Sequence, residues 1–551
     1  MPLPDTASGT LSSVFAHAFA DQCRRWANDE GKDAAWQAGY RLALAEQEGQ
    51  TCITITDAEA YVLSRSGLLA TEEDSGKPLV VDRSGRLYLA RYFVAEKKLA
   101  AALLARNRAL PFSLQGRSDA MLKQLFPDCE HDAQRQAVML ALQRQLVILS
   151  GGPGTGKTHT IARLLACLLA ESPELRIALA APTGKAAARM QESLLQASKS
   201  LPLEIAALLP SRSFTLHRLL GISGDGSSPR YHSGNPLPFD LCVIDEASML
   251  DLALAEQLCA AIPASARLIL LGDKAQLPSV EAGNVFAALM EAEALQEAVI
   301  ELKKSYRFQE DSPLGSLVAA LARGDREGAE TAFSLPGDDL DWLQEQGTTL
   351  SAKALNMLAE GFALWRSAYA AWSPGASPLP LFAALNEFRI LTALREGERG
   401  ALAINALLNR LFAPRHHAEK LYPGQAIMIS RNDPDTRLYN GDTGIILPAP
   451  EAASAAFLKA CFPDPETGGW RYLDLARLPE FESAFALTVH KAQGSEFTRI
   501  ALVLPGQDTP LLTRELVYTA LTRAKKRALL LADPRLLTSA LGRCCGAAHG
   551  N

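Results

Sequence analysis

One short segment constrains the fold of this chain more than any other. Residues 151–158 read Gly-Gly-Pro-Gly-Thr-Gly-Lys-Thr and fit the pattern G-x4-GK-[ST]. The segment follows an apolar run, LVILS, and opens a stretch with helical spacing, THTIARLLACLLA. A strand, a glycine-rich turn and a helix in this order form a phosphate cradle, because backbone N–H groups and the positive end of the helix dipole point at one anion. The sequence therefore predicts a nucleotide-binding α/β domain.

Side chains in and after this loop divide the chemistry of a nucleotide site among them. Lys157 is expected to reach the β- and γ-phosphates, and the Thr158 hydroxyl to ligate Mg²⁺. The apolar run LCVI ends in Asp245, the expected second ligand of Mg²⁺, and Glu246, which is placed to orient and deprotonate the attacking water. The later run GDKAQLPS supplies Gln276, whose amide is expected to sense the γ-phosphate by hydrogen bonding.

Apolar strands alternate with helical stretches in two parts of the chain. LVILS, RIALAAP, LCVIDEA and ARLILLGD fall between about 130 and 310, and FRILTAL, AFALTVH and RIALVLP between 388 and 505. Fully buried parallel strands have this composition, so both parts are predicted to be α/β. Short strands with Asn-Gly turn chemistry interrupt the second part and predict a small β insertion at about 415–480.

The remaining N-terminal stretch has a different character. Apolar positions recur at helical spacing in residues 1–115, and no catalytic motif occurs there. The expected division is therefore a helical N-terminal domain over 1–115, a first α/β domain over 116–312 and a second over 313–551.

Composition excludes several classes of protein. The 551 residues are 48% hydrophobic and 21% charged, which is unlike a disordered, collagen-like or coiled-coil chain. The net charge of −6 excludes a uniformly basic nucleic-acid binder, although a local basic groove remains compatible with it. There is neither a membrane-length apolar run nor a signal-peptide pattern. The nine cysteines do not have the sequence spacing of metal-ligand pairs. A cytoplasmic protein with reduced thiols and no membrane contact is expected.

Eight segments in one order resemble the motifs of superfamily-one helicases. They are 151–158, APTGKA (181–186), TLHRLLG (215–221), VIDEASM (243–249), GDKAQLPSV (272–280), SYRF (305–308), TVHKAQGSEF (488–497) and VYTALTRAK (517–525). Further segments resemble the RecD family, the α chain of exodeoxyribonuclease V: HSGNPL (232–237), ALREG (393–397), RND (431–433) and LYNGD (438–442). The resemblance implies two RecA-like P-loop motor domains, an N-terminal docking domain and an SH3-like insertion.

The same resemblance implies a function. Members of this family translocate 5′→3′ on DNA at the expense of ATP, with Mg²⁺, inside a RecBCD-type helicase–nuclease that processes broken duplex ends. The implied partners are RecB and RecC in a heterotrimer, together with single-stranded DNA and duplex DNA ends. The nuclease centre of that complex belongs to another subunit, and no carboxylate cluster in this sequence has a convincing nuclease pattern.

The resemblance also assigns site residues. Arg307 and Arg523 resemble arginine fingers, whose guanidinium fork matches the charge on the γ-phosphoryl oxygens. Gln134 resembles an adenine-reading glutamine, with Gln136 as the alternative register, and Glu496 either contacts the ribose or supports its loop. The implied nucleotide-binding set is Gln134, Gly151, Gly152, Pro153, Gly154, Thr155, Gly156, Lys157, Thr158, His159, Gly494 and Glu496, of which His159 is a helix-face neighbour without a catalytic role. The expected DNA contacts are Thr183, Lys185, Thr215, His217, Thr488, His490 and Lys491.

Two alternatives stay open at this level. The chain could be an independent RecD-like helicase that works without RecB and RecC. It could also be a P-loop ATPase switch, although a switch needs no second motor domain with TVHKAQGSEF. The loop at 221–238 is either a wedge that parts the DNA strands or an ordinary surface loop.

Overall fold

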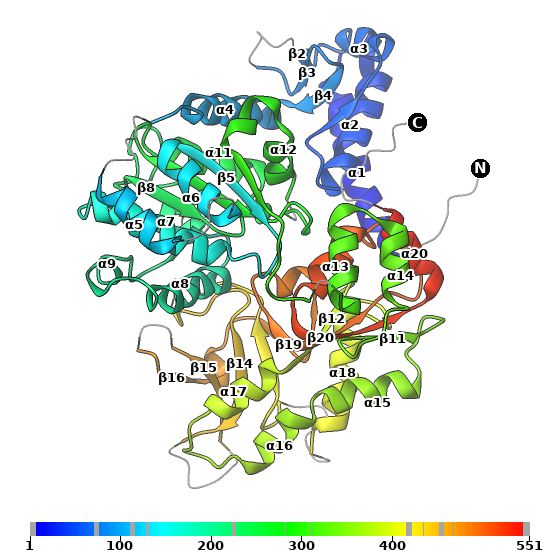
Figure 1. Cartoon of the computed structure of the whole chain (residues 1–551). Helices are drawn as coiled ribbons and strands as arrows, with labels where there is room; N and C mark the ends of the chain where they lie inside the picture. The colour runs from blue at the N-terminus through cyan, green and yellow to red at the C-terminus, as the bar shows by residue number, and fades with distance from the viewer. Residues whose placement is uncertain are drawn as a thin grey trace.

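Four sheets organise the part of the chain that the structure describes (Figure 1). None of the helices in the described residues combines the length and apolar character that a membrane crossing needs. The computed structural model describes residues 7–70, 76–110, 116–127, 132–222, 228–279, 281–309, 311–414, 421–433, 435–450, 457–464 and 467–543.

The N-terminal unit contains the predicted helices together with a small sheet that the sequence did not predict. Its strands contain only two to four residues, which is too short for the alternation that marks a strand in a sequence. The sheet order is β1 (Cys52–Thr54), β4 (Arg86–Leu89), β3 (Leu79–Val81), β2 (Leu69–Ala70). The helices are α1 (Ala7–Trp26), α2 (Lys32–Gln47), α3 (Asp57–Ser64) and α4 (Ala90–Arg106).

The first α/β domain is built on a six-stranded sheet in which every neighbouring pair is parallel. The strand order is β10 (Val299–Leu302), β5 (Leu146–Gly151), β9 (Arg267–Gly272), β8 (Leu241–Ile244), β6 (Ile177–Ala181), β7 (Phe214–Thr215). Its helices are α5 (Arg117–Leu125), α6 (Ala133–Gln143), α7 (Lys157–Glu171), α8 (Gly184–Ser198), α9 (Leu203–Ala206), α10 (Leu216–Leu220), α11 (Leu252–Ala261) and α12 (Val285–Glu291). The four predicted strands are β5, β6, β8 and β9, and the short edge strands β7 and β10 were missed.

The second α/β domain is built on a five-stranded parallel sheet. The strand order is β11 (Leu340–Gln344), β20 (Ala524–Ala532), β19 (Phe497–Val503), β12 (Phe388–Thr392), β18 (Ala486–Thr488). Its helices are α13 (Pro313–Arg323), α14 (Arg326–Ala332), α15 (Ala352–Gly361), α16 (Ala363–Ala371), α17 (Leu379–Asn386), α18 (Ala401–Phe412), α19 (Arg514–Leu521) and α20 (Pro534–Gly542). The three predicted strands are β12, β18 and β19.

Between β12 and β18 the chain forms a separate antiparallel sheet, where the sequence predicted a β insertion. Buried apolar side chains from its strands, such as Ile427, Ile446 and Phe462, form its own core. That this insertion has an SH3-like fold stays a prediction. The sheet order is β16 (Trp470–Asp474), β15 (Leu458–Pro463), β14 (Thr443–Pro448), β13 (Ala426–Ile429), β17 (Phe481–Ser483).

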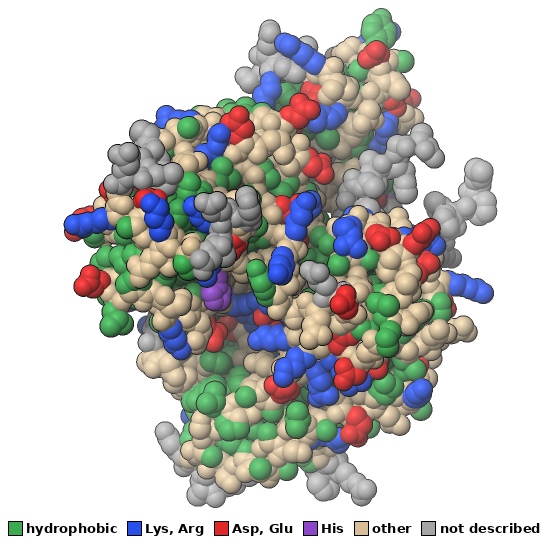
Figure 2. Space-filling model, in the orientation of Figure 1, with side chains coloured by type: hydrophobic (Ala, Val, Ile, Leu, Met, Phe, Trp, Pro, Cys, Tyr) green, Lys and Arg blue, Asp and Glu red, His purple; other side chains and the backbone are tan. Residues whose placement is uncertain are grey.

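The two α/β domains touch through specific hydrogen bonds. The Leu277 N–H donates to Thr519 Oγ1 at 2.8 Å, and Gln493 Nε2 donates to the Leu277 carbonyl oxygen at 3.3 Å. Figure 2 shows Lys and Arg side chains gathered near the middle of the visible face, over β19 and β20. The strand β20 begins with exposed Lys525, Lys526 and Arg527. The net negative charge of the chain therefore hides a local basic surface beside the domain boundary.

Candidate nucleotide and DNA site

The phosphate loop connects the buried strand β5 to the first turn of α7. Gly154 and Gly156 have φ values of +78° and +85°, which is backbone that glycine adopts without strain. A Cβ on Gly156 would also lie 2.2 Å from Nε2 of Gln134, so a side chain here would displace the amide of Gln134. Inside the loop, Thr155 Oγ1 donates to the Gly152 carbonyl oxygen at 2.8 Å. The loop thus has the backbone shape that the sequence motif predicted.

Lys157 is the first residue of α7, and its side chain folds back over the phosphate loop. Its Nζ donates to the carbonyl oxygens of Gly151 and, at 3.4 Å, Gly152. Thr158 follows it, half-buried in the first turn of α7, while His159 is exposed on the helix. The ammonium group thereby stands beside the N-terminus of α7, where an anion receives both its charge and the helix dipole.

Two carboxylates stand at the end of the neighbouring strand β8. The Glu246 N–H donates to Asp245 Oδ1 at 2.8 Å, and Glu246 adopts a left-handed φ of 52° that turns the chain sharply after the strand. Burial raises the pKa of Asp245, the charge of Glu246 raises it further, and Lys157 opposes both. A carboxyl oxygen and a hydroxyl are the kinds of oxygen group that Mg²⁺ prefers, so Asp245 and Thr158 could hold such an ion.

A buried polar network joins the first α/β domain to α19 of the second. Tyr518 Oη donates to Asp273 Oδ2 at 2.8 Å, and Gln276 Nε2 donates to the same oxygen at 3.2 Å. Gln276 Oε1 accepts from Arg523 Nη2 at 2.8 Å, so one amide touches both domains. Burial raises the pKa of Asp273, although Lys157 and the two donors lower it. The predicted γ-phosphate sensor and one predicted arginine finger are therefore direct hydrogen-bond partners.

The segment Ser305–Phe308 lies directly over the phosphate loop. The Tyr306 N–H donates to the Gly154 carbonyl oxygen at 2.8 Å, and Ser305 Oγ donates to that of Pro153 at 3.0 Å. Arg307 reaches the other domain, where its Nη1 donates to the Thr522 carbonyl oxygen at 3.3 Å. Both predicted arginine fingers thus lie at the boundary between the two α/β domains, termed the cleft below.

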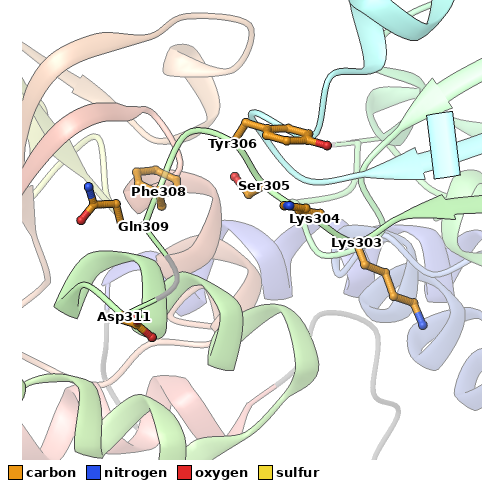
Figure 3. A pocket seen from close by; sticks show the side chains of 7 residues that line it. All are labelled: Lys303, Lys304, Ser305, Tyr306, Phe308, Gln309 and Asp311. Atoms are coloured by element: carbon orange, nitrogen blue, oxygen red, sulfur yellow. The ribbon is translucent and has the colours of Figure 1, made fainter. Parts of the chain in front are cut away.

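A pocket of about 760 Å³ opens beside this segment. Figure 3 shows the Tyr306 ring extending from the segment, and 65% of this residue is exposed. An exposed aromatic ring next to a phosphate loop offers an apolar face to a base. Tyr306 was not predicted as a base-binding residue, although an aromatic side chain next to Arg307 was the available signal in the sequence. The pocket is lined by Lys303, Lys304, Ser305, Tyr306, Phe308, Gln309 and Asp311.

The structure distinguishes the two candidate adenine-reading glutamines. Gln134 is buried, and its Nε2 donates to the Thr155 carbonyl oxygen at 3.2 Å. Its Oε1 accepts from Arg163 Nη1 at 3.1 Å. Gln136 is exposed. Gln134 is therefore the glutamine that contacts the phosphate loop, and both ends of its amide have protein partners.

The predicted DNA-contact threonines have structural partners as well. Thr183 and Thr215 cap α8 and α10 by accepting from the backbone N–H groups of Ala186 and Arg218, each at 3.2 Å. Thr488 accepts in the same way from Lys491 N at 3.3 Å. These hydroxyls lie at or just beyond the carboxyl ends of parallel strands, where sheets of this type bind ligands. Their O–H groups are still able to donate to a phosphate.

The basic residues of this predicted DNA surface differ in their surroundings. His217 is exposed, and burial lowers the pKa of His490. Lys491 Nζ pairs with Glu482 at 2.6 Å. Lys185 Nζ donates to Thr443 Oγ1 at 3.1 Å, which joins the first α/β domain to the β insertion. The loop at 221–238, either a wedge or an ordinary surface loop, falls partly outside the described residues, and the rest contains a bridge between His232 and Asn235.

Glu496 and Gly494 lie where the two α/β domains meet. Gly494 has a φ of +71°, and a Cβ there would lie 3.2 Å from Cβ of Ala186 on α8. Glu496 forms ion pairs with Arg189 of α8 and with Arg307. The structure therefore brings Glu496 to the arginines of the cleft, while its predicted contact with the ribose remains a prediction.

Known proteins match both α/β domains. Residues 134–282 match a family described as AAA domain, and 483–531 match a UvrD-like helicase C-terminal domain. RecBCD enzyme subunit RecD of Mycolicibacterium smegmatis is 38% identical over 499 residues, which cover 88% of this chain and 84% of that protein. The chain belongs to the RecD family. RecD of Haemophilus influenzae is 32% identical over 514 residues, with 83% of this chain and 78% of that protein covered.

A third relative has a different name from these RecD subunits. The ATP-dependent RecD2 DNA helicase of Deinococcus radiodurans is 32% identical over 548 residues, which cover 94% of this chain and 68% of that protein. The AAA match includes the phosphate loop, Asp245 and Gln276, and the UvrD-like match includes Glu496 and Arg523. Membership of the RecD family makes this chain an ATP-hydrolysing DNA helicase.

Proposed function

We propose that this chain is the 5′→3′ motor of a RecBCD-type complex, which acts with RecB and RecC on duplex DNA ends in the cytoplasm. The observation that carries the proposal is the nucleotide site itself, because groups from both α/β domains meet there. Gln276 of the first domain bonds to Arg523 of the second. Arg307, from the connecting segment Ser305–Phe308 that leads from the first domain toward the second, reaches Thr522. Relatives named as RecBCD subunits support the choice of partners.

The division of roles follows from the chemistry of each group. Lys157 and the phosphate-loop N–H groups bind phosphate, and Glu246 orients and deprotonates the attacking water. Asp245 and Thr158 would hold Mg²⁺, which neutralises charge on the phosphate oxygens. Arg523 and Arg307 would stabilise the charge that spreads over the transferred group. We assign these roles from the positions of the side chains and the family motifs.

Movement follows from the position of the site between two domains. When phosphate draws arginines of both domains toward one point, the cleft closes, and hydrolysis with phosphate release lets it open. The residues that lie along the carboxyl ends of β6, β7 and β18 would contact the DNA backbone. Hydroxyl and backbone contacts to phosphates carry no base information, so we expect sequence-tolerant binding of single-stranded DNA.

A second function is favoured by one specific observation. The RecD2 helicase of Deinococcus radiodurans aligns with 94% of this chain, so an independent helicase with the same motor is a real alternative. Both functions require the same nucleotide chemistry. They differ in whether the chain needs partner subunits to separate strands.

The coupling of hydrolysis to DNA tests the proposed site. ATP hydrolysis by the purified chain is expected to rise several-fold with unstructured single-stranded DNA and to require Mg²⁺. Lys157→Gln is expected to abolish turnover without changing the far-ultraviolet circular dichroism. Normal turnover in this variant would overturn the assignment of the phosphate loop. A rate of ATP hydrolysis that is the same with and without DNA would favour an ATPase switch over a helicase.

A further inference from the structure

One carboxylate in the cleft contacts three cationic side chains from different parts of the chain. Glu496 follows η5, the short 3-10 helix at His490–Ala492, and its side chain is only 10% exposed. It pairs with Arg189 from α8 and with Arg307, and Lys525 Nζ lies 3.8 Å from its Oε2. The first α/β domain, the connecting segment and the second α/β domain therefore meet at a single acid.

The charges at this point do not balance within the cluster. Burial alone would raise the pKa of Glu496, but Arg189, Arg307 and Lys525 outweigh it and lower the pKa, so the group is ionised. One negative charge faces three positive charges. Arg189 and Arg307 share one carboxylate oxygen and are 35% and 15% exposed, so both guanidinium groups can offer N–H donors to a phosphate group that binds beside them.

Arg189, which pairs with Glu496, also lies near charged groups of the nucleotide site. It stands close enough to Asp245, at the end of β8, for its charge to lower the pKa of that carboxyl group. It also lowers the pKa of Arg523 and of Arg307 by repulsion. Arg189 lies outside the segments that resemble helicase motifs, because α8 continues beyond APTGKA. Arg189 and Arg307 share the carboxylate oxygen Oε1 of Glu496, and the residue before Arg307 bonds to the phosphate loop, so Arg189 is a third arginine near that loop, on the same domain as Lys157.

We propose that Glu496 holds Arg189 and Arg307 while the site lacks a terminal phosphate, and that both arginines transfer to the terminal phosphate when ATP binds. The proposal deepens the proposed function, because it requires the same nucleotide site. ADP has no terminal phosphate and leaves the arginines on Glu496. Arg189 therefore distinguishes ATP from ADP, and Glu496 is a positioning residue that competes with the nucleotide for its arginines.

The test compares the equilibrium binding of two nucleotides to the full chain. A non-hydrolysable ATP analogue and ADP, each with Mg²⁺, are titrated against wild type and Arg189→Ala. The variant is expected to bind the analogue about 10- to 100-fold more weakly, as loss of a charge-assisted hydrogen bond predicts, and ADP within twofold of wild type. Arg189→Lys is expected to recover part of the loss, since it keeps the charge but not the planar fork. Equal weakening for both nucleotides, or none, overturns the proposal.

Two further variants separate this role from a structural one. Glu496→Gln removes the competing charge, so it is expected to bind the ATP analogue several-fold more tightly than wild type while ADP binding stays unchanged. Weaker binding of both nucleotides would show that Glu496 contacts the nucleotide directly, and would contradict the proposal. Arg176→Ala breaks an exposed pair with Asp240 on the same domain and serves as the matched control.

Failure of this inference is distinguishable from failure of the proposed function. If the wild-type chain hydrolyses ATP and Lys157→Gln does not, the nucleotide site stands whatever Arg189→Ala does. If the wild-type chain neither binds nor hydrolyses ATP, the site assignment itself has failed. Unfolding midpoints of all variants within a few degrees of wild type establish that binding changes reflect the cleft and not the fold.

Discussion

Replacing Tyr518 by Phe removes one hydroxyl from the interface between the two α/β domains and changes little else. This hydroxyl donates at 2.8 Å to Asp273, and both groups are buried. A hydrogen bond to an ionised group contributes about 1.5–3 kcal/mol, which corresponds to about 10- to 100-fold in an equilibrium between domains in contact and apart. Because hydrolysis needs groups from both domains, kcat/KM for ATP is expected to fall by about that factor at about pH 8.

The pH dependence of this loss provides the sharper test. Burial raises the pKa of Asp273, and the Tyr518 hydroxyl opposes that rise by stabilising the ionised form. As the pH falls through the pKa of Asp273, the acid takes up a proton and the bond becomes one between neutral groups, which contributes only about 0.5–1.5 kcal/mol. The ratio of wild-type to variant kcat/KM is therefore expected to shrink toward acidic pH. In the variant, Asp273 loses a donor, so its pKa rises further.

The assay is steady-state ATP hydrolysis with saturating single-stranded DNA across the pH range. The ratio of the two proteins cancels any ionisation that both share. Tyr92→Phe is the matched control, since Tyr92 donates at 2.5 Å to Glu46 in the N-terminal unit, far from the cleft. The control is expected to match wild type. A Tyr518→Phe enzyme within twofold of wild type at high pH, or a deficit that grows toward acid, would refute the reasoning.

Three other outcomes are expected. Glu246→Gln should bind ATP normally while single-turnover hydrolysis falls by about 10²- to 10⁴-fold, because the general base is lost; unchanged hydrolysis would exclude Glu246 as the base. Arg523→Ala should keep nucleotide binding, measured by titration, and lose DNA-stimulated hydrolysis by about 10³-fold; lost binding would instead make Arg523 structural. Burial and the charge of Arg389 lower the pKa of Lys185 to about 8 against the pull of Asp442. Wild-type affinity for single-stranded DNA, measured by anisotropy, should therefore weaken as pH rises through that value, and Lys185→Ala should remove this dependence and lower the salt slope by about 0.7.

The sequence predicts most interior strands of the two parallel sheets, for a physical reason, although it missed β20, whose first half is charged. Parallel strands buried on both faces are continuous apolar runs, so β5, β8 and β9 stand out in the sequence. The phosphate loop is equally local, because eight consecutive residues specify both its shape and its chemistry. Edge strands such as β7 and β10 are short and only partly apolar, and they escaped prediction.

Contacts between segments far apart in the chain could not be predicted from the sequence. Nothing local shows that Arg523 meets Gln276, or that Arg189 meets Glu496, because each pair forms only when the two α/β domains come together. The threonine expected to contact DNA at the start of α8, Thr183, also caps that helix, a role that its place before the helix could have indicated. The chemical role of a side chain could therefore be predicted from its residue type and motif, whereas its contact partners could be identified only from the folded structure.

The direction of unwinding tests the central claim most directly. Duplexes with a single-stranded tail at either the 5′ or the 3′ end are given ATP, Mg²⁺ and the purified chain, alone and with RecB and RecC. In reactions with partners, inactivating substitutions in the RecB motor ensure that only this chain drives strand separation. Unwinding of the 5′-tailed duplex that becomes strong only with partners is the predicted result. Unwinding from the 3′ tail, or of neither substrate in any combination while ATP hydrolysis persists, would contradict the account.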